Sequence, residues 1–124
     1  MAVTTTPLGN GFDYDITLDS TTDITPEKNV RNGPCTLRTV ELVNSDAQAT
    51  YLKIYDNDGG VLVPGTTAPD FILPVAGSGT VEYEFLDGHD LVNGLSFLAA
   101  EETGDDVTTS SATLTTRIVT ANAA

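Results

Sequence analysis

Thr80-Val-Glu-Tyr-Glu-Phe-Leu86 alternates apolar and polar side chains without interruption. Successive side chains of a β-strand point to opposite faces of a sheet, so this period of two predicts a strand with one buried face. Ala76-Gly-Ser-Gly79 before it and Asp87-Gly88 after it are turn sequences that we expect to bound the strand. The alternation assigns three side chains to a core, namely Val81, Tyr83 and Phe85. The carboxylates of Glu82 and Glu84 are then expected on the solvent side.

Segments of the same kind recur along the chain, separated by turns rich in Gly, Pro and Asp. No stretch carries a convincing helical period. Residues 12–18 (Phe-Asp-Tyr-Asp-Ile-Thr-Leu) alternate as cleanly as residues 80–86, which predicts that the apolar side of that strand is buried. The strands that we expect are residues 12–18, 36–44, 51–55, 71–75, 80–86, 94–99 and 112–120. This pattern predicts an all-β fold, an antiparallel β-sandwich or jelly roll of about seven to eight strands.

Three of the expected strands have features of their own. Residues 36–44 carry apolar side chains on both faces, which favours a strand that is covered on two sides. The alternation in Tyr51-Leu-Lys-Ile-Tyr55 points Leu52 and Ile54 one way and the other three side chains the opposite way. Pro74 cannot donate a ladder hydrogen bond, so its short apolar strand is expected at a sheet edge or a bend.

The domain organisation follows from where this patterning begins. A chain of 124 residues fits one domain, and residues 12–124 carry the strand pattern throughout. Residues 1–11 are polar, contain Pro7, Gly9 and Gly11, and lack strand periodicity. We therefore expect an extended N-terminal arm over residues 1–11 and a single β-sandwich domain over residues 12–124.

The charge balance excludes several classes of partner. Eighteen acidic residues against five basic ones give a formal net charge of −13. Binding to nucleic acid or to an anionic membrane surface requires clustered Lys and Arg, so we expect neither partner. We also expect no secretory signal and no membrane span, since no run of about 18 apolar residues occurs. Cys35 is the single cysteine, which excludes an intrachain disulfide and favours folding in a reducing cytosol.

Two acidic pairs are the first candidates for chemistry. The Cα atoms of Glu82 and Glu84 are expected roughly 6.6 Å apart on one strand face. This is near the separation of the two catalytic carboxyl groups in an inverting glycosidase. Every pair with this spacing in a strand is equally close, so a solvated face is the favoured interpretation. Asp56-Asn-Asp58-Gly-Gly60 resembles a calcium loop but lacks the third acid and the bidentate Glu of an EF-hand. We interpret it as a turn, with a weak cation site as the alternative.

Asp87-Gly-His-Asp90 is the one place where a histidine meets carboxylates. His89 could hold a metal with Asp87 or Asp90, or act as a base. It could also be the base that activates Cys35 as a nucleophile. A single His in a polar turn is more often a turn residue, and no third group that would orient a Cys35–His89 pair is identifiable. The sequence carries no phosphate loop and no dinucleotide fingerprint. We therefore expect no enzyme activity, no catalytic or cofactor-binding residue, no cofactor and no metal site.

From residue 36 onward the chain shows a characteristic order of features. It begins with Leu37-Arg-Thr-Val40, a turn at Asn44-Ser45 and the strand Tyr51-Leu-Lys-Ile-Tyr55. It continues through a loop ending in Pro, a short apolar strand, a strand ending in Phe and a Gly-Leu-Ser-Phe strand, namely residues 64–69, 71–79, Phe85 and residues 94–99. An acidic, Thr-rich loop and a last strand complete it. In this order the chain resembles a group of small β-sandwich structural proteins of tailed viruses.

Such proteins are capsid decoration (cement) proteins or tail accessory proteins that lack an active site. The resemblance implies a non-enzymatic virion protein that binds the outer surface of the major capsid protein shell and stabilises it. It also implies a homo-oligomer, with a trimer favoured, that is made in the host cytoplasm and works on the capsid surface. The alternative is a receptor- or carbohydrate-binding module of a tail or fibre. The candidate aromatic side chains for such a module are Tyr14, Tyr51, Tyr55 and Tyr83.

Overall fold

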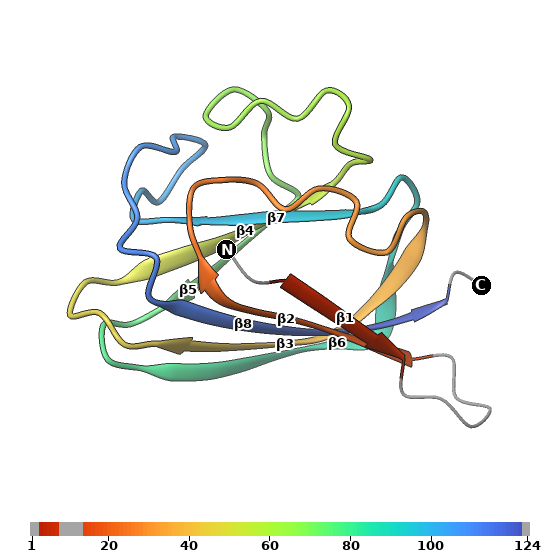
Figure 1. The fold of residues 1–124 in the computed structure, drawn as a ribbon, viewed down its shortest axis with the longest axis horizontal. Coiled ribbons are helices and arrows are strands. Elements are labelled where there is room, and N and C mark those ends of the chain that lie inside the picture. The colour runs from red at the N-terminus through yellow and green to blue at the C-terminus, as the bar shows by residue number, and fades with distance from the viewer. Residues whose placement is uncertain (1–2, 8–13, 123–124) are drawn as a thin grey trace.

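A computed structural model describes residues 3–7 and 14–122 of the chain (Figure 1). These residues form an antiparallel β-sandwich without a helix, which confirms the all-β prediction. Its strands are β1 (Val3–Pro7), β2 (Tyr14–Thr22), β3 (Cys35–Asn44), β4 (Thr50–Asp56), β5 (Phe71–Val75), β6 (Thr80–Leu91), β7 (Leu95–Ala100) and β8 (Leu114–Asn122). One sheet has five strands in the order β1-β2-β8-β3-β6, and the other has three in the order β5-β4-β7.

The core lies between the sheets and is built from their aliphatic inner faces. Its fully buried members include Leu37, Val40, Leu42, Leu52, Ile54, Phe97 and Ile118. Three side chains of β6 pack against this cluster as the alternation predicts, namely Val81, Tyr83 and Phe85. They are only half-buried, because β6 is an edge strand. Glu82 and Glu84 are exposed on the opposite face, again as predicted.

The register of β3 shifts once along its length, between Leu37 and Thr39. Because of this bulge, Leu37 and Val40 both face the core although they are three residues apart. The apparent change of face between Leu37 and Val40 therefore comes from the bulge. The expectation that both faces of this strand are covered is wrong, since Val43 on the outer face is 39% exposed.

β6 continues beyond the end that the sequence predicts for it. The strand passes through Asp87 and Gly88 and ends at Leu91, so this Asp-Gly pair is an irregularity within a strand and not its terminating turn. Asp87 and Gly88 have φ angles of 63° and 79°, in the left-handed region. A Cβ atom on Gly88 would lie 2.5 Å from Cγ2 of Thr36, so glycine is required here for two independent reasons.

Two long loops, residues 57–70 and 101–113, cover the outer face of the smaller sheet (Figure 1). Leu52 and Ile54 of β4 point into the main core and Tyr55 points the other way, as the sequence predicts. The outward side is nevertheless buried, because the loops bring apolar side chains onto it. This second cluster consists of Tyr55, Leu62, Leu98 and Ala100, with Ile24 and Val107 packed against it.

Lys53 fixes the acidic loop onto this face. Its side chain is fully buried, and Nζ donates hydrogen bonds to the carbonyl oxygens of Gly104 (2.5 Å) and Asp106 (2.6 Å). Burial lowers the pKa of Lys53, while the carboxylates of Glu102, Asp105 and Asp106 act in the opposite direction. Lys53, which the alternation places on the face opposite Leu52 and Ile54, thus anchors the loop above it.

The segment between β2 and β3 closes one side of the sandwich by running along the free edge of β7. Glu27 and Phe97 exchange backbone hydrogen bonds of 2.8 and 2.9 Å, and the Ala99 amide donates to the Asp23 carbonyl (2.9 Å). On the opposite side, the Tyr83 hydroxyl donates to the carbonyl oxygen of Pro74 and so links β6 to β5. The two sheets are therefore held together by polar contacts at both of these margins.

Residues 1–11, for which we expect an extended arm, contain an edge strand of the sandwich. β1 pairs antiparallel with β2 along its whole length, and the hydroxyls of Thr5 and Thr17 lie 2.9 Å apart. Thr favours extended backbone on either face of a strand. A Thr-rich segment can therefore pair at a sheet edge without an alternation of apolar and polar residues. The other residues of the expected arm, 1–2 and 8–11, lie outside the described residues.

Candidate functional site

β2 lies in the larger sheet with its two faces reversed relative to the prediction from residues 12–18. Thr17 and Asp19 face the interior and are fully buried. Ile16 and Leu18 face outward, and Leu18 is 43% exposed. The period of two is real, but the expectation that the apolar side of this strand is buried is wrong.

The reversal follows from what covers the inner side of β2. Five strands face only three, and the segment 23–34 lies against β2 where the smaller sheet does not reach. Arg31 of this segment forms an ion pair with Asp15, with Nη2 and Oδ2 2.6 Å apart. Deeper in the interior, the Thr22 hydroxyl donates to the hydroxyl of Thr116 in β8 (2.8 Å). Polar side chains are favoured on this side because they find partners there.

Asp19 is a buried carboxylate in this polar interior. Its Oδ1 atom accepts a hydrogen bond from the Thr21 amide (3.0 Å), and Oδ2 has no hydrogen-bond partner among the described residues. Burial raises the pKa of Asp19, although the bond from Thr21 lowers it in part. Burial, followed by the Asp19 charge, also raises the pKa of Glu27 in the covering segment. Ionisation of these two carboxyls therefore destabilises the fold.

The outward side of β2 and the neighbouring side of β8 form a continuous apolar surface. Ile16 lies opposite Val119, and Tyr14 lies opposite Ala121, so side chains of the same character meet across the two strands. Leu18 extends this surface by one more position along β2. We call these five residues the apolar strip: Tyr14, Ile16, Leu18, Val119 and Ala121. Phe12, which continues the sequence pattern, lies outside the described residues.

The other half of the same sheet face is acidic. Glu41 of β3 lies directly opposite Glu82 of β6, and Glu84 follows two residues along β6. We call Glu41, Glu82 and Glu84 the acidic row. Like charges opposite each other on neighbouring strands destabilise a sheet, so this arrangement is a cost to folding. Glu82 and Glu84, the candidate glycosidase pair, are both exposed to solvent on this open face.

Two arginines lie at the border between these halves. Arg117 of β8 is opposite Leu18 on one side and opposite Glu41 on the other. Arg38, at the bulge of β3, reaches across β8 and places its guanidinium carbon 5.8 Å from the centroid of the Tyr14 ring. That distance is within the range of a cation–π interaction. The outer face of the larger sheet therefore changes from apolar through cationic to acidic between β2 and β6.

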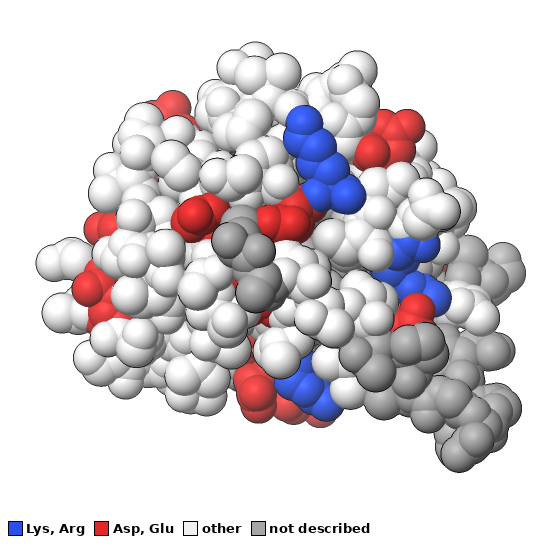
Figure 2. All heavy atoms as spheres, in the orientation of Figure 1, with Lys and Arg blue, Asp and Glu red and all other residues white. Residues whose placement is uncertain are grey.

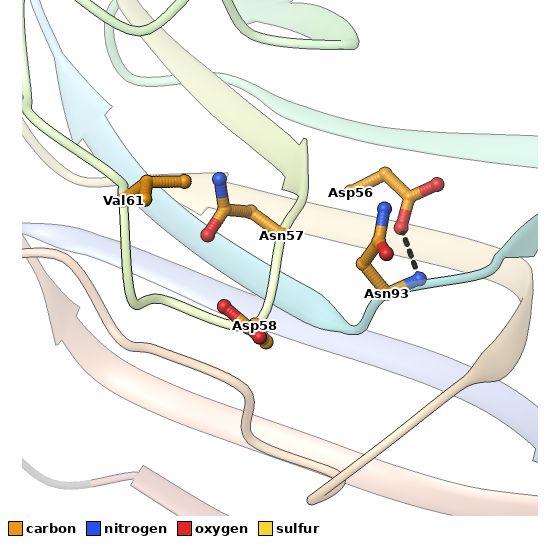
Figure 3. A pocket seen from close by; sticks show the side chains of 5 residues that line it. All are labelled: Asp56, Asn57, Asp58, Val61 and Asn93. Carbon is orange, nitrogen blue, oxygen red and sulfur yellow. Dashed lines mark hydrogen bonds between the residues drawn. The ribbon is translucent and has the colours of Figure 1, made fainter.

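Asp56, at the end of β4, has a structural task in the turn that resembles a calcium loop. Its carboxylate accepts hydrogen bonds from the backbone amides of Val92 (3.1 Å), Asn93 (2.8 Å; Figure 3) and Gly94 (3.4 Å). The side chains of the next two residues cap the turn through the amides of Gly59 and Gly60. These contacts hold the chain as it bends away from the end of β4. The hollow of about 280 Å³ beside it is lined by Asp56, Asn57, Asp58, Val61 and Asn93.

The candidate residues around His89 do not form one cluster. Cys35 is 1% exposed among core side chains, and burial raises the pKa of its thiol. The His89 ring packs edge-on against Phe71, with the ring centroids 4.8 Å apart. The Asp90 carboxylate instead accepts a hydrogen bond from a threonine of β3 (2.9 Å). Within residues 3–7 and 14–122, no group of three or more His, Cys, Asp or Glu side chains is placed to hold a metal ion.

The four candidate tyrosines lie on different surfaces. Tyr14 belongs to the apolar strip, and Tyr51 is half-buried on the outer side of the smaller sheet. Tyr55 is fully buried beneath the loops, where burial raises its pKa to about 12. Tyr83 lies between the sheet margins with its hydroxyl bonded to Pro74. The structure thus does not bring them together into one aromatic platform.

The outer face of the larger sheet is the strongest candidate for a functional surface, because it combines exposed apolar side chains with ordered charges. In the described part of the chain, no helix has the length and apolar character that a membrane crossing requires. Comparisons of this chain with protein-family models, with curated proteins and with solved structures find no match.

Proposed function

We propose that this chain is a non-enzymatic structural protein of a tailed-virus particle. In this role it is a capsid decoration protein, made in the host cytoplasm, that binds the outer surface of the major capsid protein shell and stabilises it, as a homo-oligomer with a trimer favoured. The proposal rests on the resemblance of the strand and turn order from residue 36 onward. The structural observation that supports binding to another surface is the apolar strip on the outside of β2 and β8.

The apolar strip supports a binding role because it leaves neighbouring apolar side chains on the outer face of the sheet. Single exposed apolar side chains are normal on soluble proteins, but a contiguous patch on an otherwise polar surface marks an interaction site. Here the same strand buries Thr17 and Asp19 while Ile16 and Leu18 face outward. A partner that covers the outer face would remove this apolar area from water.

The sandwich also suits a repeated surface. The strip and the acidic row lie on regular strands of one sheet, so they are held in fixed positions before any partner binds. Binding to a preformed surface of this kind costs little ordering entropy. On a symmetric shell, many copies with weak individual contacts add up through multivalency.

The test is to add the purified chain to virus particles that lack it. After sedimentation, quantitative mass spectrometry counts the bound copies per particle, and heating measures the temperature at which the shell opens. We expect saturable binding of hundreds of copies and a shell that opens at a higher temperature. A handful of copies would favour the tail or fibre alternative, and no binding would contradict both.

A further inference from the structure

We infer that the outer face of the larger sheet binds a protein surface on which basic side chains lie beside apolar ones, and that this partner is not a second copy of the chain. The inference rests on the proposed function, since it states the chemistry of the surface that the chain would cover. It combines the apolar strip and the acidic row into one docking face.

The two halves of this face are aligned row by row across the strands. Leu18, Arg117, Glu41 and Glu82 follow one another in a single row from β2 to β6. The next row begins with Ile16 and ends at Glu84 in the same order. Both rows therefore run from an apolar side chain on β2 to a carboxylate on β6, and a partner that matches one of them also matches the other.

The acidic half of the docking face has more carboxylates than cations beside them. Arg117 lies opposite Glu41, but Glu82 and Glu84 lie beyond it on the edge strand β6. Among the described residues, the only ion pair joins Arg31 to Asp15, on the other side of the sheet. Glu84 also lines a hollow of about 240 Å³ together with Arg38 and Leu86, whose side chain is 91% exposed. A lysine or arginine from a partner would neutralise the acidic row, and apolar side chains beside it would cover Leu86 and the apolar strip.

A second copy of the chain cannot supply those cations. Of the five basic residues of the chain, Lys53 binds loop carbonyls and Arg31 pairs with Asp15. Arg38 and Arg117 lie on the docking face itself, so a second copy that docked through this face would bring three glutamates of the acidic row for every two arginines. Lys28 alone remains, and one exposed lysine cannot match the acidic row. From the side shown in Figure 2, basic groups are likewise few.

The experiment compares three double variants of the full chain with the wild type for binding to particles that lack it, in about 0.1 M and about 1 M sodium chloride. The first, Ile16→Ser with Leu18→Ser, removes exposed apolar area, and we expect at least about tenfold weaker binding at both salt concentrations. The second, Glu82→Lys with Glu84→Lys, should weaken binding about tenfold or more at low salt and much less at high salt. The control, Asp58→Lys with Val61→Ser on the far loop, should bind within about twofold of the wild type.

Each outcome bears on a separate statement. If the wild type binds and the first two variants bind like the control, the docking face is wrong while the proposed function stands. If the wild type does not bind, the proposed function fails.

Sedimentation velocity of the free chains supplies the second test, in which the mass should be the same for the wild type and the Ile16→Ser, Leu18→Ser variant. A lower mass for that variant would show that a second copy occupies the face and would overturn the inference. Circular dichroism confirms that each variant is folded.

Discussion

Replacing Leu18 by Ala should cost much less stability than the clean alternation of its strand would suggest. Leu18 is 43% exposed on the outer face of β2, so the truncation removes few buried contacts and leaves no closed cavity. We expect a loss of about 1 kcal/mol or less in the free energy of unfolding. Leu42 of β3 is fully buried in the main core, and Leu42→Ala should cost about 3 to 5 kcal/mol.

The assay is urea unfolding followed by circular dichroism, because the chain has no tryptophan. Both variants carry the same chemical change, so the difference between their unfolding free energies isolates the effect of burial. Thr17→Val serves as a further probe, since it breaks the hydroxyl pair with Thr5 on the buried side and should cost about 1 kcal/mol. Equal losses for Leu18→Ala and Leu42→Ala would refute the orientation of β2 described above.

Three more predictions concern charges. Lys53→Met leaves two loop carbonyls without their donor and should cost about 2 to 3 kcal/mol in urea unfolding, whereas the exposed Lys28→Met should change little. The raised pKa values of Asp19 and Glu27 mean that the protonated carboxyls stabilise the fold. This stability is present below their ordinary pKa values of 3.8 and 4.5 and is lost as pH rises through the raised pKa values of the folded state. Asp19→Asn should therefore raise the melting temperature at pH 7 but not at about pH 3.5, and equal shifts would contradict this. For the wild type, sodium chloride at about 1 M should raise the melting temperature above that at about 0.1 M, because it screens the net charge of −13.

The strands themselves could be predicted because their patterns depend on local geometry alone. Residues 71–75 are a strand as expected, and Val81, Tyr83 and Phe85 point toward the core as the alternation predicts. The direction of Leu52 and Ile54 in β4 could be predicted for the same reason. In all these cases the inner face meets the apolar face of the other sheet, so the usual link between apolar character and burial holds.

The candidate surface could not be predicted, because it depends on which face of a strand is covered and by what. The alternation of residues 12–18 shows that the two faces differ, and only the tertiary structure shows that the polar face lies beneath the segment 23–34. Lys53 is hidden for a similar reason, since its burial comes from a loop about 50 residues later in the chain. The spacing of Leu37 and Val40 did carry a signal, because an interval of three between core residues in a strand indicates a bulge.

The most direct measurement of the central claim is hydroxyl-radical footprinting of the chain, free and bound to particles. Radicals oxidise exposed side chains, so the extent of oxidation reports which part of the surface a partner covers. If the outer face of the larger sheet is the docking face, then Leu18 and Leu86 lose their reactivity on the particle, while Val61 and Val63 on the opposite loop keep theirs. Protection of Val61 and Val63 with unchanged oxidation of Leu18 would contradict the claim and place the contact on the loops instead.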